Sequence, residues 1–328
     1  MAGPLSRDVG RIARDARTGV ASRRQWSRYS TRTFYLFIAP WFLLGFIGLT
    51  TIPLTYAFLL SFTNFDGISG HWHWIGLDNY SELISDPDTW YSLGRTLLFL
   101  VITVPLSTAS GLGLALLLNQ RIRAVGLFRT IFYVPSVVPV VASVVIWRIM
   151  FDRDSGFLNA VIGWVGRPAI TWLIDPTAFL ALIVMVLWGL GGGMVIFLAG
   201  LQGIPGELRE AAAIDGANAV RTFRAVTLPL LTPVIFFQAV TGVIAALQTL
   251  IQPLLLSQAG TGATGSEVQR SNFLYMVNVY QQFFSNQRFG YGAALLWLLF
   301  AVILLITLLF FRSSALWVYY ELRQEKGG

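Results

Sequence analysis

Residues 210–229 read Glu-Ala-Ala-Ala-Ile-Asp-Gly-Ala-Asn-Ala-Val-Arg-Thr-Phe-Arg-Ala-Val-Thr-Leu-Pro, and they stand between two long apolar stretches. Alanine is the strongest helix former, so this stretch predicts a short helix. Gly216 predicts a break, because glycine accepts backbone conformations that strain residues with a Cβ atom. A second helical stretch is expected to end before Leu228-Pro229. A loop that only connects two membrane helices needs a few polar residues and a turn. We therefore interpret this stretch as a rigid element that is presented to something outside the membrane.

The composition of the whole chain indicates a membrane protein. Of its 328 residues, 55% are hydrophobic and 12% are charged, whereas soluble domains carry about 25% charged residues. The usual size of about 150 residues per domain applies to soluble proteins and gives no reason to divide this chain. One transmembrane domain is expected. The chain has no cysteine, which excludes disulfides, thiol nucleophiles and cysteine-ligated metals.

The net charge of +7 is concentrated near the start of the chain, where eight arginines precede Phe34. A basic cluster of this kind is found in nucleic-acid-binding proteins and on the cytoplasmic side of membrane proteins. We interpret it as a signal of membrane orientation and expect no nucleic-acid partner.

Six segments are apolar and long enough to cross a hydrocarbon core that takes about 20 helical residues. The sequence predicts an all-α polytopic membrane protein with a basic tail (1–33), a transmembrane domain (34–312) and a C-terminal tail (313–328). The first segment is too long for the apolar region of a signal peptide, so we expect a permanent helix. The six predicted spans are 34–62, 93–118, 125–151, 178–201, 226–256 and 292–311.

The loops between these segments alternate in charge. Loop 63–90 holds five acidic residues and no Lys or Arg, and the next turn holds Arg121 and Arg123. Because basic loops stay in the cytoplasm, both chain ends and the loop around Glu210 are expected to be cytoplasmic.

Several predicted spans contain residues that break helices in water. Such breaks persist in membranes where neighbouring helices or a cavity satisfy the freed backbone groups. They are typical of helices that line a pathway, although close helix packing and tolerated kinks are the more common explanation for any single residue. The residues concerned are Pro105, Pro135, Pro139, Pro229, Pro233 and the run Gly191-Gly192-Gly193.

A polar stripe follows the fifth predicted span. Its members step by three and four residues and would share one helix face over about 21 Å. Glutamine amides facing lipid would cost several kcal/mol, so the stripe must face protein or water. Hydrogen bonding between helices and the lining of a path for an uncharged, hydroxyl-rich solute both fit. The stripe consists of Gln238, Thr241, Ala245, Gln248 and Gln252.

The chain carries neither an ion relay nor a nucleotide site of its own. No predicted span has Asp, Glu, Lys or His in its middle, which argues against ion-coupled transport. A phosphate-binding loop needs a lysine before a hydroxyl residue, and the only lysine, Lys326, precedes Gly327. We therefore expect a transporter subunit rather than an enzyme, with nucleotide hydrolysis left to a partner.

The opening stretch resembles the EAA motif of ATP-binding-cassette (ABC) importer permeases, with Glu207 adding negative charge just before it. Residues 198–205, Trp188 and residues 290–295 resemble the branch that imports carbohydrates, the maltose and glycerol-phosphate type. The likeness covers roughly residues 34–312. The motif positions matched are Glu210, Ala211, Ala212, Asp215, Gly216, Ala217, Phe223, Leu228 and Pro229.

The resemblance implies a type I ABC importer permease in a bacterial plasma membrane. It implies a second, related permease, two cytoplasmic ATPase subunits that hold ATP and Mg, and an extracytoplasmic solute-binding protein. The loop 203–225 would dock in a groove of an ATPase, and no cofactor is expected in this chain. Candidate substrate-pathway residues are Trp188, Gly192, Gln238, Thr241, Gln248 and Gln252.

The substrate class stays open, because the chain departs from the family pattern after the fifth span. The family often has Phe-Asp followed by Leu-Thr-x-Gly-Gly-Pro there, whereas this chain has Leu250-Ile251 and then 256–261. The leading hypothesis for the solute is a sugar or oligosaccharide. A phosphate-bearing solute such as a glycerophosphodiester would want arginines, for which Arg95 and Arg148 are the candidates, and a polyol is also open. The third alternative is a channel or membrane enzyme independent of ATP. His71-Trp72-His73 is interpreted as loop packing or a binding-protein contact rather than a metal site.

Overall fold

The computed structural model describes residues 33–70, 72–120, 123–256 and 268–319. Within these ranges the chain is almost entirely helical, and the β-structure consists of one bridge between Thr63 and Trp74. The chain divides into two compact units, Met1–Leu60 and Ser61–Gly328. The described part of the first unit is a single apolar span, Thr33–Leu60, which contains the π-helix η1 (Phe42–Thr51) and α2 (Ile52–Leu60).

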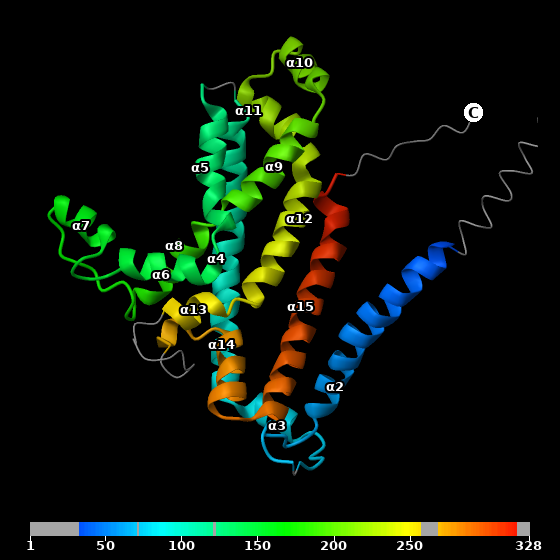
Figure 1. Cartoon of the computed structure of the whole chain (residues 1–328). Helices are drawn as coiled ribbons and strands as arrows, with labels where there is room; N and C mark the ends of the chain where they lie inside the picture. Colours follow the sequence, from blue (N-terminus) through cyan, green and yellow to red (C-terminus); the bar gives the residue numbers. More distant parts are fainter. Residues whose placement is uncertain (1–32, 71, 121–122, 257–267, 320–328) are drawn as a thin grey trace, which may run out of the picture. The chain divides into compact units, whose positions relative to one another are not determined.

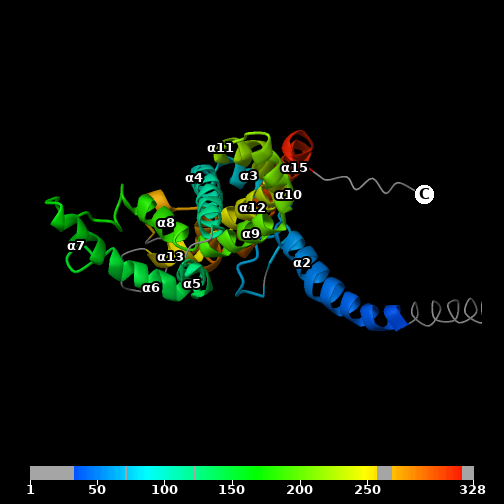
Figure 2. The same ribbon diagram turned by 90° about the horizontal axis from the view of Figure 1, so that it is seen from above.

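The second unit holds all the remaining elements. Helices α4, α9 and α12 pack against one another, α5 packs on α9, and α15 packs on α12 and α3 (Figures 1 and 2). Its elements are α3 (Asp78–Ser85), α4 (Pro87–Leu118), α5 (Val125–Val137), α6 (Val140–Met150), α7 (Phe157–Trp164), α8 (Ala178–Leu187), α9 (Gly191–Gly203), α10 (Gly206–Ile214), α11 (Ala219–Thr222), η2 (Phe223–Thr227), α12 (Leu228–Leu247), α13 (Ile251–Leu256), η4 (Arg270–Asn272), α14 (Tyr275–Tyr280), η5 (Gln281–Ser285) and α15 (Phe289–Trp317).

Among the residues that the structure describes, four helices are long and apolar enough to cross a membrane, and up to six spans result if each of two bent helix pairs counts as one. The core lies where α4, α8, α12, α14 and α15 meet. There the side chains of Phe99, Leu182, Leu247, Tyr275 and Leu295 are at most 1% exposed. Large side chains buried to this degree fix the helices around α4.

Helix α4 is longer than predicted, because it starts at Pro87 rather than near residue 93. Asp86 caps it by accepting a hydrogen bond from the backbone N–H of Asp88 at 3.0 Å. Proline fits the first turn of a helix, where its missing N–H would have no partner. The first turn of this helix therefore contains polar residues, and a search for apolar stretches alone does not find it. Pro105 lies inside α4 without ending it, so the expected interruption there is absent.

The third predicted span, 125–151, is not one helix. It divides into α5 and α6, which meet at 102°. The break falls at Val138, which has extended backbone angles (φ −66°, ψ 129°), because the ring of Pro139 disfavours helical geometry in the residue before it. Helix α6 then leads away from the α4–α9–α12 group towards α7 (Figures 1 and 2).

The fourth predicted span bends by 42° between α8 and α9. The bend falls at residues 188–190, and the glycine run that the sequence marks as a weak point follows it as the first turn of α9. The fifth ends at Leu247 rather than at 256, and a new short helix, α13, starts at Ile251. Pro253 lies in the first turn of α13, where its missing N–H would have no partner. Pro233, in contrast, lies inside α12 without interrupting it.

Candidate functional site

We call residues 203–225 the motif loop. Its first helix is α10, which carries Glu207 in its first turn and Glu210, Ala211 and Ala212 further on. Asp215 follows the last helical residue. Gly216 has φ +76°, and its N–H donates to the carbonyl of Ala213 at 3.0 Å. The N–H of Ala217 donates to the carbonyl of Ala212 at 2.9 Å. These two bonds form a Schellman motif, the helix end for which glycine is preferred because of its left-handed conformation. The predicted helix and its break are both present.

The second half of the loop differs from the expectation. The helical stretch does not end before Leu228-Pro229, because Ala219–Leu247 forms one span of 29 residues. Phe223 opens the π-helical turn η2, and α12 follows without interruption. Pro229 therefore lies inside a continuous helix, and the wide π-turn directly before it accommodates its ring and its missing N–H.

The tip of the motif loop exposes apolar side chains beside its charges. Ile214 is 87% exposed and Val220 is 60% exposed. Glu207, Glu210 and Asp215 are exposed as well. Asn218, which stands between Ile214 and Val220 in the sequence, caps α11 by accepting from the N–H of Arg221 at 2.9 Å. A fixed loop that offers both apolar and acidic groups has the chemistry of a protein contact.

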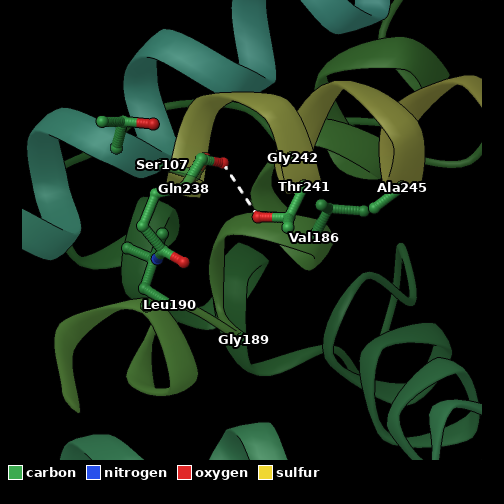
Figure 3. A pocket seen from close by; sticks show the side chains of 10 residues that line it. Ser107, Val186, Gly189, Leu190, Gln238, Thr241, Gly242 and Ala245 are labelled. Carbon is green, nitrogen blue, oxygen red and sulfur yellow. Dashed lines mark hydrogen bonds between the residues drawn. The ribbon is translucent and has the colours of Figure 1, made fainter. Parts of the chain in front are cut away.

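A second candidate site is a cleft of about 380 Å³ between α4, the α8–α9 bend and α12 (Figure 3). We call it the bend cleft. Its walls are polar or without side chains at several positions, and no charged residue is among those that line it in the described part of the chain. The lining consists of Ser107, Thr108, Val186, Gly189, Leu190, Gly193, Gln238, Thr241, Gly242 and Ala245.

The hydroxyl groups of the bend cleft are partly engaged with their own helices. Ser107 donates to the carbonyl of Val104 at 3.0 Å. Thr241 lies within bonding distance of the carbonyls of Phe237 (2.8 Å) and Gln238 (3.2 Å), the second of which is drawn in Figure 3. Their oxygen lone pairs remain available as acceptors. The side chain of Gln238 makes no hydrogen bond to the described residues, so its amide offers both donors and an acceptor.

Glycines set the shape of this cleft. A Cβ atom at Gly193 would meet Nε2 of Gln238 at 2.7 Å, and one at Gly242 would meet the side chain of Val104 at 3.4–4.0 Å. The absent side chain at position 193 therefore leaves the room that the Gln238 amide occupies. Gly189 and Leu190, which lie at the bend between α8 and α9, line the cleft together with Gly193.

The structure brings together only part of the predicted pathway set. Gln238, Thr241 and Ala245 line the bend cleft. Gln248 lies just beyond the end of α12, and Gln252 belongs to α13. The predicted stripe is thus wrong at its last two positions, because the helix whose face they were to share ends before them.

Two other predicted pathway residues also lie outside the lining. Trp188 follows α8 and packs edge-on against the ring of Trp147, with ring centroids 6.0 Å apart. A Cβ atom at Gly192 would face Ser136 on α5 at 3.8 Å. Both residues pack helices together, as close packing by small and aromatic residues in membranes would suggest. The neighbours Gly189 and Gly193 line the cleft instead.

Ser107 and Thr108 are pathway candidates that the sequence analysis missed. They are adjacent hydroxyl residues in the second span, where most of the neighbouring residues are apolar, and they line the cleft from α4. A search for polar pairs within each apolar span would have found them.

The two arginines considered for a phosphate-bearing solute are not in the bend cleft. The Arg95 guanidinium lies 4.0 Å from the ring centroid of Phe179 and donates from Nε and Nη2 to the carbonyl of Ser271 at 2.9 and 2.7 Å. Arg148 lines a separate hollow of about 200 Å³ together with Asp152 and Arg153. The bend cleft therefore lacks the guanidinium groups that a phosphate would favour.

The His-x-His sequence is only half within the described residues, since His71 lies outside them. The backbone N–H of His73 donates to Oδ1 of Asn64 at 2.6 Å, which ties the loop to itself. No group of three or more His, Cys, Asp or Glu side chains is arranged to hold a metal ion in the part of the chain that the structure describes.

Residues 104–320 match the family of binding-protein-dependent transport system inner membrane components, and the chain belongs to that family. It is therefore a membrane-spanning permease subunit of an ABC importer, a transporter component and not itself an enzyme. The motif loop and the bend cleft both lie within the matched residues.

Individual relatives agree with this assignment. The chain is 38% identical to a probable ABC transporter permease protein, YesP, of Bacillus subtilis (strain 168), over 89% of this chain and 93% of the relative. It is 32% identical to the lactose transport system permease protein LacF of Rhizobium radiobacter, over 89% of this chain and 97% of LacF. It is also 32% identical to the trehalose/maltose transport system permease protein MalF of Thermococcus litoralis, over 73% and 79% of the two chains.

A solved structure has the same fold. A bacterial ABC transporter involved in the import of the acidic polysaccharide alginate superposes with a TM-score of 0.72 at 22% sequence identity, covering 91% of this chain and 98% of that chain. At this identity the likeness establishes the ABC importer permease fold and says nothing of the solute.

Proposed function

We propose that this chain forms half of the translocation pathway for a neutral sugar or oligosaccharide. The observation that carries the proposal is the bend cleft, which offers an amide and several hydroxyl groups and has no charged lining residue in the described part of the chain. Sugar hydroxyl groups both donate and accept hydrogen bonds, and a glutamine amide satisfies both roles without the desolvation cost of a charge. Relatives named for lactose and for trehalose and maltose support a sugar.

The remaining partners follow from the family. A second, related permease would complete the pathway, and two ATPase subunits with ATP and Mg would drive it. An extracytoplasmic binding protein would deliver the solute, as one is present in a structure of the alginate transporter with similar fold. The bacterial plasma membrane, with both chain ends in the cytoplasm, is the corresponding location.

The loop 203–225 is the proposed contact with an ATPase. Its exposed Ile214 and Val220 would enter an apolar groove, and Glu207, Glu210 and Asp215 would meet basic groups at the rim. The continuous span from Ala219 to Leu247 supports this role, because a displacement of the loop would move α12, which lines the bend cleft.

The alternative of a phosphate-bearing solute has less support, since Arg95 is bonded elsewhere and Arg148 lies in another hollow. Uptake separates the two classes. The assembled importer with its binding protein is reconstituted in vesicles, and uptake of labelled maltose, trehalose and lactose is compared with that of glycerol 3-phosphate. Uptake of a neutral sugar is expected, and uptake of glycerol 3-phosphate alone would overturn the proposal.

A further inference from the structure

Four residues between α13 and α14 join two helices that line the bend cleft. These residues, Gln269–Asn272, are called the strap. On one side they bond to α4: Arg270 pairs with Asp88 at 2.7 Å, and Ser271 accepts from Arg95 through its carbonyl. The Arg270 guanidinium also lies 3.9 Å from the ring centroid of Tyr91, whose hydroxyl donates to the Arg270 carbonyl at 3.0 Å.

On its other side the strap bonds to the start of α8. The side-chain amide of Asn272 donates to the carbonyl of Ala178 at 3.1 Å, and Asn272 is 4% exposed. Ser271 donates to Asp175 through both its backbone N–H (3.2 Å) and its hydroxyl. The backbone N–H of Asp175 in turn donates to Oε1 of Gln269 at 3.2 Å.

Arg95 connects all three segments. It lies on α4, its guanidinium donates twice to the strap, and the same group covers the ring of Phe179 in the first turn of α8. Because two bonds from one planar guanidinium fix its orientation, this side chain sets the spacing between α4 and α8. Arg95 and Ser107 are 12 residues apart on α4, or about 18 Å along the helix axis.

The contact between α4 and α12 is of a different kind. No hydrogen bond joins α12 to α4 or to α8 among the described residues. Helices α4 and α12 pack extensively on each other without such bonds, and one close approach is between Gly242 and the side chain of Val104. Apolar contacts are non-directional and can slide, whereas the strap's hydrogen bonds would have to break for α4 and α8 to separate.

We propose that the strap positions α4 and α8 as a single wall of the bend cleft, with Arg95 as its central positioning residue, so that α12 is the wall that moves. This inference rests on the proposed function, since it assumes that solute occupies the bend cleft. Among the helices that line the cleft, α12 belongs to the span Ala219–Leu247, which begins inside the motif loop and runs on without a break.

Cross-linking tests the moving wall. The chain has no cysteine, and the Cβ atom of Val104 would lie 4.0 Å from a Cβ atom at position 242, within the range that a disulfide accepts. The variant V104C/G242C is assembled into the full importer with partner cysteines replaced. Disulfide yield is then compared between the nucleotide-free and vanadate-trapped states. A several-fold difference is expected, and equal yield would overturn the moving wall. The single variants V104C and G242C serve as controls.

Solute affinity tests the strap. Arg95→Met should raise the KM of sugar uptake roughly tenfold or more per assembled importer, since small displacements of binding groups weaken productive binding strongly. Arg95→Lys, which keeps one donor to Ser271, should recover part of the loss. Ser271→Ala removes the hydroxyl bond to Asp175 and gives a milder variant if Arg95→Met fails to assemble. Arg167→Gln, which removes a guanidinium outside the strap, is the matched control.

The outcomes separate the two proposals. If the unmodified importer takes up none of the tested sugars, the proposed function fails while the cross-link comparison still reports on α12. If it takes up sugar and both Arg95→Met and Ser271→Ala keep the KM of the unmodified protein, the strap proposal fails alone. A lower amount of assembled importer with unchanged KM would also contradict a positioning role.

Discussion

Gly193 on α9 and Gln238 on α12 fit together so closely that a Cβ atom at position 193 would meet Nε2 of the glutamine at 2.7 Å. The amide is the flexible end of a side chain, so it can shift at small cost. Gly193→Ala is therefore expected to leave assembly intact and to change the KM of sugar uptake. Gly113→Ala on α4, where a Cβ atom would meet no atom within 4 Å, is the control. An equal KM in the two variants would contradict a cleft shaped by this contact.

The polar lining leads to a second prediction. Gln238→Leu removes the only side-chain amide of the bend cleft's described lining, and each lost hydrogen bond to a neutral group is worth about 0.5–1.5 kcal/mol. We expect transport efficiency, measured as kcat/KM of sugar uptake, to fall several-fold or more. Gln248→Leu lies beyond α12 and should have little effect. A larger fall in kcat/KM for Gln248→Leu than for Gln238→Leu would contradict the bend cleft as the pathway and would favour the longer predicted stripe.

Gly216 tests the motif loop. A β-branched residue in its left-handed conformation (φ +76°) costs about 1–3 kcal/mol, whereas asparagine tolerates that region. Gly216→Val should therefore leave the protein in the membrane but lower uptake and solute-stimulated ATP hydrolysis. Gly216→Asn should retain more of both. Because a Cβ atom at this position would meet nothing within 4 Å, the effect of valine is conformational. Normal uptake by Gly216→Val would contradict the docking role.

Gly290 at the start of α15 has a structural role. Its N–H donates to the carbonyl of Phe65 at 2.9 Å, and an added Cβ atom would clash with the carbonyl oxygen of Thr63. Backbone atoms cannot yield as a side-chain end can, so Gly290→Ala should destabilise the protein by about 1–3 kcal/mol. The measurement is the thermal unfolding midpoint in detergent, with Gly94→Ala as control. An unchanged midpoint would mean that loop 63–75 detaches from α15 without cost.

The sequence predicts most of the helices and the motif loop but not the limits of the spans. The Schellman end at Gly216 follows from local chemistry, since glycine adopts the left-handed conformation that this helix end requires without the steric penalty of a Cβ atom. The sequence marks Pro139 as a break, and the structure places that break at Val138, but hydropathy does not show how sharply the chain turns there because the residues on both sides are apolar. The early end of α12 was not predicted, although Gln248, Thr249 and Gln252 interrupt the apolar run after Leu247.

The cleft could be predicted only in part for a related reason. Gln238 and Thr241 stand out by type and spacing, and they do line it. Gly193 and Ser107 contribute through where α9 and α4 place them, and tertiary packing is not visible in a spacing pattern. Trp188 resembles the family pattern, yet its ring packs on Trp147.

The two bent helix pairs also bear on topology. The α5–α6 and α8–α9 pairs follow one another between Leu118 and the motif loop, and each either crosses the membrane or does not. If both cross, or if neither does, the number of crossings in this interval is even. The motif loop then emerges on the same face as the end of α4. Treating the pairs alike therefore fixes the sidedness of the loop by parity, whether the chain has four spans or six.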